Sequence, residues 1–83
     1  MKLLYFAWLR EKAKVGEETV APPKSVKTVG DLVDWLRKRG GGFADAFADV
    51  SMVRAAVNQE HVPFDHPVKA GDEIAFFPPV TGG

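Results

Sequence analysis

The chain has 83 residues, which suits one small domain with a thin core and leaves too little volume for a deep internal active site. Its 11 basic and 11 acidic residues give a net charge of zero, which removes the electrostatic driving force for nucleic acid or for an anionic membrane surface. The absence of cysteine excludes a disulfide scaffold, a thiol nucleophile and a thiolate metal site, and it fits a cytoplasmic protein.

The first segment, Leu3–Trp8, is a short aromatic and aliphatic run that predicts a buried strand. A signal peptide fits less well, because the charged residues Arg10–Lys12 follow and no small-residue cleavage site is present. A weaker strand is predicted over Glu17–Ala21, where Pro22 and Pro23 end it. The two strands are expected to form a hairpin with a long loop.

A helix is predicted to begin at Thr28, which can cap it, with Asp31 at the capping-box position. Its apolar face follows the helical period: Val29, Leu32, Val33 and Leu36. The cations of Arg37–Arg39 suit the last turn, and Gly40–Gly42 are expected to stop the helix rather than to bind phosphate, since no strand precedes them. Phe43–Ala48 are expected to form a short second helix or a turn.

The C-terminal half predicts three strands. The first is Val53–Val57, with a turn at Asn58–Gln59. A short strand is predicted over His61–Phe64, with a turn at Asp65–Pro67 after it. The last strand, Glu73–Phe77, is strongly apolar.

This order of elements predicts an α+β fold in which one main helix packs on a mixed sheet of four to five strands. The first and last strands are the most apolar, so they are expected to lie side by side and parallel in the middle. That arrangement is the ubiquitin-like β-grasp. We expect residues 1–77 to form the domain and residues 78–83 to form an extended C-terminal tail.

Few side chains of the predicted domain indicate chemistry. His61 and His66 have no further ligands at metal-site spacing and no nucleophile to activate. A turn at Asp65–Pro67 is therefore preferred to a catalytic or metal site. Trp35 is either an exposed contact residue or a side chain that leans over the helix edge onto the sheet. The acidic pairs Glu17–Glu18 and Asp72–Glu73 are expected to be solvated strand ends and turns.

The C-terminal segment differs. Pro78 and Pro79 favour polyproline II geometry, in which six residues span roughly 18 Å at ~3.1 Å per residue. Gly82 and Gly83 lack side chains and can pass through a narrow channel. The α-carboxylate of Gly83 is then the group available for activation as an acyl adenylate. The alternative is a frayed terminus.

Short segments along the whole chain, from the first strand to the tail, resemble the small subunit of molybdopterin synthase. The most specific part of the resemblance is the ending Phe-Phe-Pro-Pro-Val-x-Gly-Gly, since a bare Gly-Gly is shared by all ubiquitin-like modifiers and sulfur carriers. The matching segments are Tyr5–Ala7, Leu9–Glu11, Val57–Gln59, Phe64–Pro67, Gly71–Glu73 and Phe76–Gly83.

The resemblance implies a sulfur carrier that is not catalytic alone but forms a subunit of a sulfurtransferase. An adenylating enzyme would use ATP to activate the carboxylate of Gly83, and a sulfur donor enzyme would convert it to a thiocarboxylate. The tail would then donate sulfur to cyclic pyranopterin monophosphate in the large subunit, within a heterotetramer, for molybdenum cofactor biosynthesis. No bound cofactor, metal, nucleic acid or membrane is expected.

The resemblance also implies a docking surface. The family's apolar docking positions map onto Phe6, Phe77 and His61, although the family often has an aliphatic residue in place of His61. The tail residues expected to contact the partner are Pro78, Pro79, Val80 and Thr81, and those expected to take part in the chemistry are Gly82 and Gly83.

Two other functions use the same kind of tail. One is a sulfur carrier for another pathway, such as thiazole synthesis, although those carriers tend to lack Phe-Phe-Pro-Pro before the glycines. The other is a ubiquitin-type modifier, in which Gly83 forms an isopeptide bond with lysine.

Overall fold

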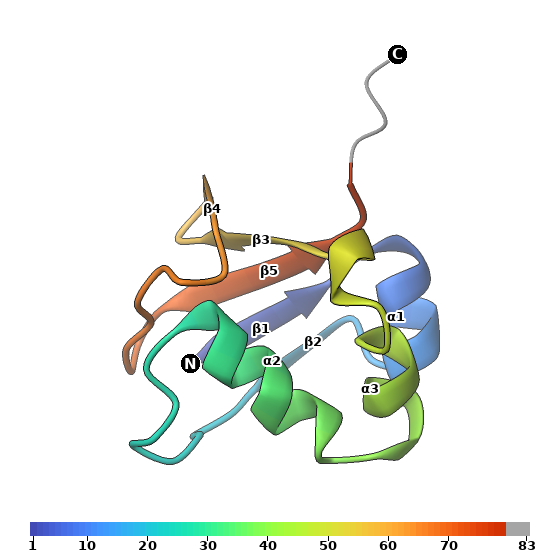
Figure 1. Cartoon of the computed structure of the whole chain (residues 1–83), viewed down its shortest axis with the longest axis horizontal. Helices are drawn as coiled ribbons and strands as arrows, with labels where there is room; N and C mark the ends of the chain where they lie inside the picture. The colour runs from blue at the N-terminus through green and yellow to red at the C-terminus, as the bar shows by residue number, and fades with distance from the viewer. Residues whose placement is uncertain (80–83) are drawn as a thin grey trace.

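The strands form one five-stranded sheet in the order β2-β1-β5-β3-β4, with helices on one side of it (Figure 1). The structure is a computed structural model, and it describes residues 1–79. Along the chain the elements are β1 (Lys2–Tyr5), α1 (Ala7–Ala13), β2 (Glu17–Thr19), α2 (Val29–Arg37), α3 (Gly41–Ala46), the 3₁₀ helix η1 (Val50–Met52), β3 (Arg54–Val57), β4 (Glu60–Val62) and β5 (Glu73–Phe77).

The two most apolar strands, β1 and β5, are parallel neighbours in the middle of the sheet, and the other pairs are antiparallel. Leu3 lies beside Ile74, and Tyr5 beside Phe76. All four of these side chains are buried, because alternate residues of a strand point to the same face. This arrangement confirms the predicted β-grasp fold.

The core lies between this face of the sheet and the helices. The rings of Tyr5 and Phe47 pack on Phe76, with centroids 6.0 and 5.0 Å from its ring. The helix α2 contributes the four residues of its predicted apolar face, all of them buried: Val29, Leu32, Val33 and Leu36. The predicted capping box is also present, since Thr28 accepts a hydrogen bond from the Asp31 amide and Asp31 accepts one from Thr28.

The predicted first strand extends too far. It ends at Tyr5, and α1 occupies Ala7–Ala13. Leu9 and Ala13 are buried one turn apart, which is the spacing of a helix face and not of a strand. Lys14 closes the helix in the left-handed conformation at φ 63°. The connection from β1 to β2 therefore contains a helix and is not a simple hairpin loop.

The three glycines separate two helices, as expected, but they also begin the second one. Gly40 has φ 76°, and α3 starts at the next residue. A β-carbon on Gly42 would lie 1.9 Å from the carbonyl oxygen of Lys12. The missing side chain of Gly42 thus lets α3 pack directly against the end of α1.

The ambiguous aromatic residue Trp35 is half-buried and packs against the core, with the Arg39 guanidinium 5.8 Å from its ring. Trp35 is therefore not the exposed contact residue of the first alternative, and its packing against the core agrees with the second. The turn after β3 is as predicted, with positive φ at both Asn58 and Gln59. The short strand β4 lies one to two residues earlier than expected. No helix in the described part of the chain is long and apolar enough to cross a membrane.

Candidate functional site

The face of the sheet opposite the helices carries none of the helices of residues 1–79 (Figure 1). Strand register places Leu4 beside Ala75, and Ala75 beside Ala56. All three are half-buried. The two alanines make the centre of this open face shallow and apolar, whereas the same register places the charged residues Lys2, Glu17 and Glu73 on its margin. A shallow apolar centre suits contact with another protein rather than enclosure of a small molecule.

The three predicted docking residues lie at one end of this open face. Phe77 and His61 form an edge-to-face pair with ring centroids 5.4 Å apart. Phe6 continues β1 in an extended conformation, and its amide donates to the carbonyl of Phe76 at 3.1 Å. Alternation along the strand puts Phe6 on the same face as Leu4, and 48% of its surface is exposed. We call Phe6, His61 and Phe77 the aromatic patch.

The aromatic patch lies where the predicted tail begins. β5 ends at Phe77, and the half-buried Pro78 and Pro79 follow directly. This end of β5 is the point at which the chain leaves the sheet in Figure 1. The remaining predicted site residues, Val80, Thr81, Gly82 and Gly83, lie outside the described residues.

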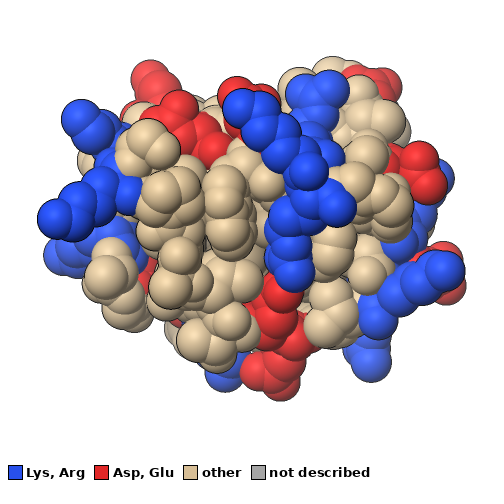
Figure 2. Space-filling view, turned by 90° about the horizontal axis from the view of Figure 1, so that it is seen from below, with Lys and Arg blue, Asp and Glu red and all other residues tan. Residues whose placement is uncertain are grey.

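The side of the molecule that carries α2 and α3 differs in character. Its Lys, Arg, Asp and Glu side chains are interspersed with uncharged residues (Figure 2). The shallow depression between α2 and α3 is lined by both signs of charge, with Asp34, Arg37 and Lys38 around Ala44 and Ala48. Because charges of both signs line this depression, it has no uniform electrostatic potential that would attract a charged ligand.

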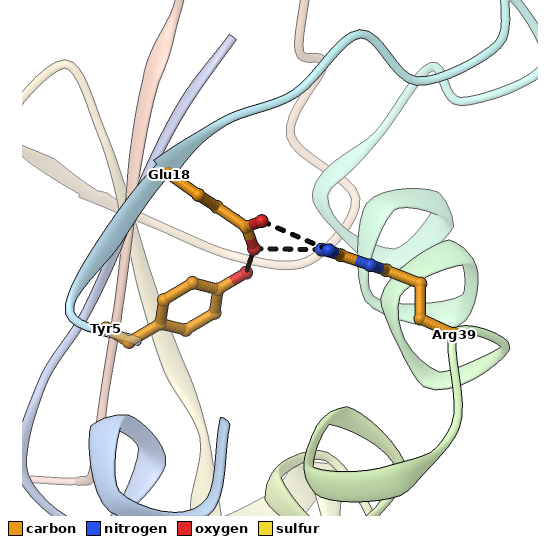
Figure 3. A network of polar contacts seen from close by, with 3 residues as sticks. All are labelled: Tyr5, Glu18 and Arg39. Atoms are coloured by element: carbon orange, nitrogen blue, oxygen red, sulfur yellow. Dashed lines mark hydrogen bonds and ion pairs between the residues drawn. The ribbon is translucent and has the colours of Figure 1, made fainter. Parts of the chain in front are cut away.

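A partly buried polar network joins β1, β2 and the segment that follows α2 (Figure 3). The Tyr5 hydroxyl donates to Glu18 at 2.7 Å, and the Arg39 guanidinium donates to both Glu18 oxygens at 2.8 and 3.1 Å. The Arg39 guanidinium also lies 4.1 Å from the Phe43 ring. The prediction that Glu18 is simply a solvated strand end is therefore wrong.

This network shifts the ionisation of both acids. Burial, and then the hydrogen bond to Glu18, raise the pKa of the Tyr5 hydroxyl far above its usual value. Partial burial acts to raise the pKa of Glu18, but the hydrogen bonds from Arg39 and Tyr5 outweigh it and hold that pKa below its usual value. The Tyr5 hydroxyl and both carboxylate oxygens of Glu18 have partners inside the network, so we assign it a structural role.

Asp72 is likewise not a solvated turn residue, since only 5% of its surface is exposed. Its carboxylate accepts from the Asn58 side chain at 3.1 Å and from the Lys69 amide at 2.9 Å. The Asn58 side chain in turn accepts from the Glu73 amide at 3.0 Å. These residues hold the turn after β3 against the start of β5. The segments Val57–Gln59 and Gly71–Glu73, two of those that carry the family resemblance, therefore have a structural role.

The two histidines lie on different segments. His61 is exposed on β4, whereas half-buried His66 lies near the start of α2, where its carbonyl accepts from the Val29 amide. Within residues 1–79, no group of three or more potential metal ligands comes together. Only His61 belongs to the aromatic patch.

Comparisons with known proteins agree with this architecture. The model of the ThiS family matches residues 3–83. The molybdopterin synthase sulfur carrier subunit of Escherichia coli is 43% identical over 83 residues, which are 100% of this chain and 99% of that protein.

Among solved structures, molybdopterin converting factor subunit 1 from Pyrococcus furiosus is 34% identical over 95% of each chain, with a TM-score of 0.75. Small archaeal modifier protein 1 from Haloferax volcanii is 29% identical over 96% of this chain and 97% of that chain, with a TM-score of 0.74. The chain therefore belongs to the ThiS family, and it is a full-length relative of the sulfur carrier subunits of molybdopterin synthase.

Proposed function

We propose that this protein is the sulfur carrier subunit of a molybdopterin synthase and acts in the cytoplasm. The observation that carries the proposal is the 43% identity to the Escherichia coli sulfur carrier subunit over the full length of both chains. The shallow centre of the open face suits a carrier that docks on a partner.

The reacting group of the proposal is the carboxylate of Gly83. An adenylating enzyme joins this carboxylate to AMP from ATP and releases pyrophosphate. A sulfur donor enzyme then supplies sulfur at the oxidation level of sulfide. This sulfur attacks the acyl carbon, the C–O bond to AMP breaks, AMP leaves, and a thiocarboxylate remains on Gly83. In this scheme the protein binds no cofactor itself, and ATP is consumed by the activating partner.

The large subunit of the synthase is the proposed acceptor of the loaded tail. The aromatic patch of Phe6, His61 and Phe77 supports this, because exposed aromatic side chains around the start of the tail supply the apolar contact area that protein interfaces use. The rings of Pro78 and Pro79 fix φ at these two positions, which lowers the backbone entropy lost there when a partner orders the start of the tail. Val80, Thr81 and Gly82 would lie inside the partner's channel and contact its walls. The sulfur would pass from Gly83 to cyclic pyranopterin monophosphate.

The activation step is tested by intact-mass spectrometry after incubation with the adenylating enzyme, ATP and a sulfur source. We expect a mass gain equal to one oxygen replaced by one sulfur, and no gain for the chain that lacks Gly83. A wild-type chain that binds the adenylating enzyme but gains no sulfur would contradict the proposal.

A second candidate function is protein modification. It is favoured by the 29% identity to small archaeal modifier protein 1. An activated Gly83 would then acylate a lysine side chain with loss of AMP. Lysine conjugates in extracts of the source cells, absent when Gly83 is deleted, would support this function. Co-purification with a thiazole synthase instead of a pterin-binding subunit would favour a third role, sulfur delivery for thiazole synthesis.

A further inference from the structure

A groove lies beside the aromatic patch, between η1 and the segment that follows β4. It has a volume of about 540 Å³. Its walls are mostly apolar and are formed by Val50, Val53, Val62, Pro63 and Phe64. Val50 is 39% exposed, so an aliphatic side chain stands uncovered at its edge.

The polar residues that line the groove are Ser51, Arg54 and His61. Among them, Arg54 carries a permanent positive charge. The guanidinium of Arg54 donates to the carbonyls of Ser51 and Val53, both at 3.1 Å, and is thereby held in place. No carboxylate of residues 1–79 lies within ion-pair distance of it. A fixed guanidinium beside apolar walls suits a carboxylate next to an apolar side chain, because the planar guanidinium binds carboxylates with two hydrogen bonds.

The groove is continuous with the aromatic patch. Arg54 lies opposite Phe77 in the register of β3 and β5. His61 lines the groove and also packs against Phe77, with ring centroids 5.4 Å apart. A protein that covers the aromatic patch therefore also meets the mouth of the groove.

We infer that this groove binds a segment of the subunit that accepts the tail, with one apolar side chain between η1 and β4 and one carboxylate on Arg54. The inference rests on the proposed function, since it assigns the groove to the same partner. It adds a second anchor point, which would fix the orientation of the carrier on its partner while the tail enters the active site.

The test uses the full chain and the molybdopterin synthase large subunit from the same organism, titrated by calorimetry. Val50→Glu places a carboxylate in the groove, where it would compete for Arg54 and disrupt the apolar walls, so we expect about tenfold weaker binding or worse. Met52→Glu is the matched control, because Met52 is also exposed on η1, at 48% against 39% for Val50, but does not line the groove. Its binding should stay within about twofold of wild type.

Arg54→Gln provides an independent variant if Val50→Glu fails to fold. It should weaken binding about tenfold and reduce the dependence of affinity on salt, because one ion pair is lost. Wild-type binding with unchanged affinity in both Val50→Glu and Arg54→Gln would overturn the groove assignment alone. No binding of the wild-type chain would instead overturn the proposed function.

The other possible occupant of the groove is this chain's own residues 80–83. Amide NMR spectra of the full chain and of a chain ending at Pro79 distinguish the two cases. We expect the amides of Ser51, Val62 and Phe64 to be unchanged by the truncation and to shift when the large subunit is added. Shifts of these amides caused by the truncation would show that the groove holds the tail and would contradict the inference.

Discussion

The two faces of the sheet use neighbouring residues of the same strands for different purposes. On the helix side, Tyr5 and Phe76 are almost fully buried and their packing stabilises the fold. On the open side, Phe6 is 48% exposed and Phe77 is half-buried, although each is only one residue further along the chain. Strand alternation thus separates residues that hold the domain together from residues available to a partner, and the two roles should respond separately to mutation.

The largest effect is expected for Phe76→Ala. This change removes a fully buried ring that packs on Tyr5 and Phe47, and it should lower the free energy of unfolding by about 3–5 kcal/mol. Phe77→Ala, the matched variant on the open face, should cost less than about 1 kcal/mol. Urea unfolding monitored by circular dichroism measures both. Equal costs would show that the two faces are not separate in the way described.

For partner binding, substitutions on the open face are expected to have larger effects than substitutions in the core. Phe77→Ala and Phe6→Ala should each weaken binding of the large subunit by about 1–2 kcal/mol, roughly tenfold, because exposed aromatic residues at an interface contribute strongly. Thr19→Ala is a control on the same face at the outer strand β2 and should bind normally. If calorimetry finds Thr19→Ala as weak as Phe77→Ala, the contact is not centred on the aromatic patch.

A smaller effect is expected at the Tyr5–Glu18–Arg39 network. Glu18→Gln should lower the free energy of unfolding by about 1–2 kcal/mol at neutral pH, because charge-assisted hydrogen bonds are lost. Glu17→Gln is the neighbouring control; its exposed ion pair with Lys2 at 3.4 Å should contribute less than about 1 kcal/mol.

The contribution of Glu18 has a definite pH dependence. Its pKa is lower in the folded chain than the usual value of 4.5, so its stabilisation is complete above that value and is lost as the pH falls below it. The difference in stability between wild type and Glu18→Gln should therefore shrink in acid. A difference that is constant from neutral to acidic pH would contradict this account.

The smallest effect is expected for Thr28→Ala, which removes the N-cap of α2. The loss should be about 1 kcal/mol of stability, with no change in partner binding, because the cap lies on the helix side of the sheet. Unfolding and titration of the same sample check both parts. Weaker binding without a loss of stability would place Thr28 in the interface and would refute its structural role.

Local signals in the sequence were sufficient for most of the fold. The capping box of Thr28 and Asp31, the apolar face of α2 and the turn at Asn58–Gln59 depend on nearby residues, and all are present. The extent of the first strand was wrong because Phe6, Ala7 and Trp8 extend an apolar run that reads equally well as strand or helix. The burial of Leu9 depends on contacts that the local pattern does not reveal.

The site was predictable only in part. Phe6 follows β1, His61 lies on β4 and Phe77 ends β5, and the family resemblance identified them before the structure placed them on one face. The structural roles of Glu18 and Asp72 were missed because their partners, Arg39 and Asn58, are distant in sequence. The groove beside Val50 was missed for the same reason, since its walls come from η1 and from the segment after β4.

The central claim is that this domain carries a reactive group to a partner's active site. The most direct test is a single-turnover reaction of the thiocarboxylated chain with the large subunit and cyclic pyranopterin monophosphate. We predict that each sulfur that appears in the pterin product is lost from Gly83, as followed by intact mass, and that deletion of Gly83 abolishes product while leaving the free energy of unfolding unchanged. Product formed by the Gly83-deleted chain, or sulfur retained on a loaded chain that is bound to the large subunit, would contradict the account.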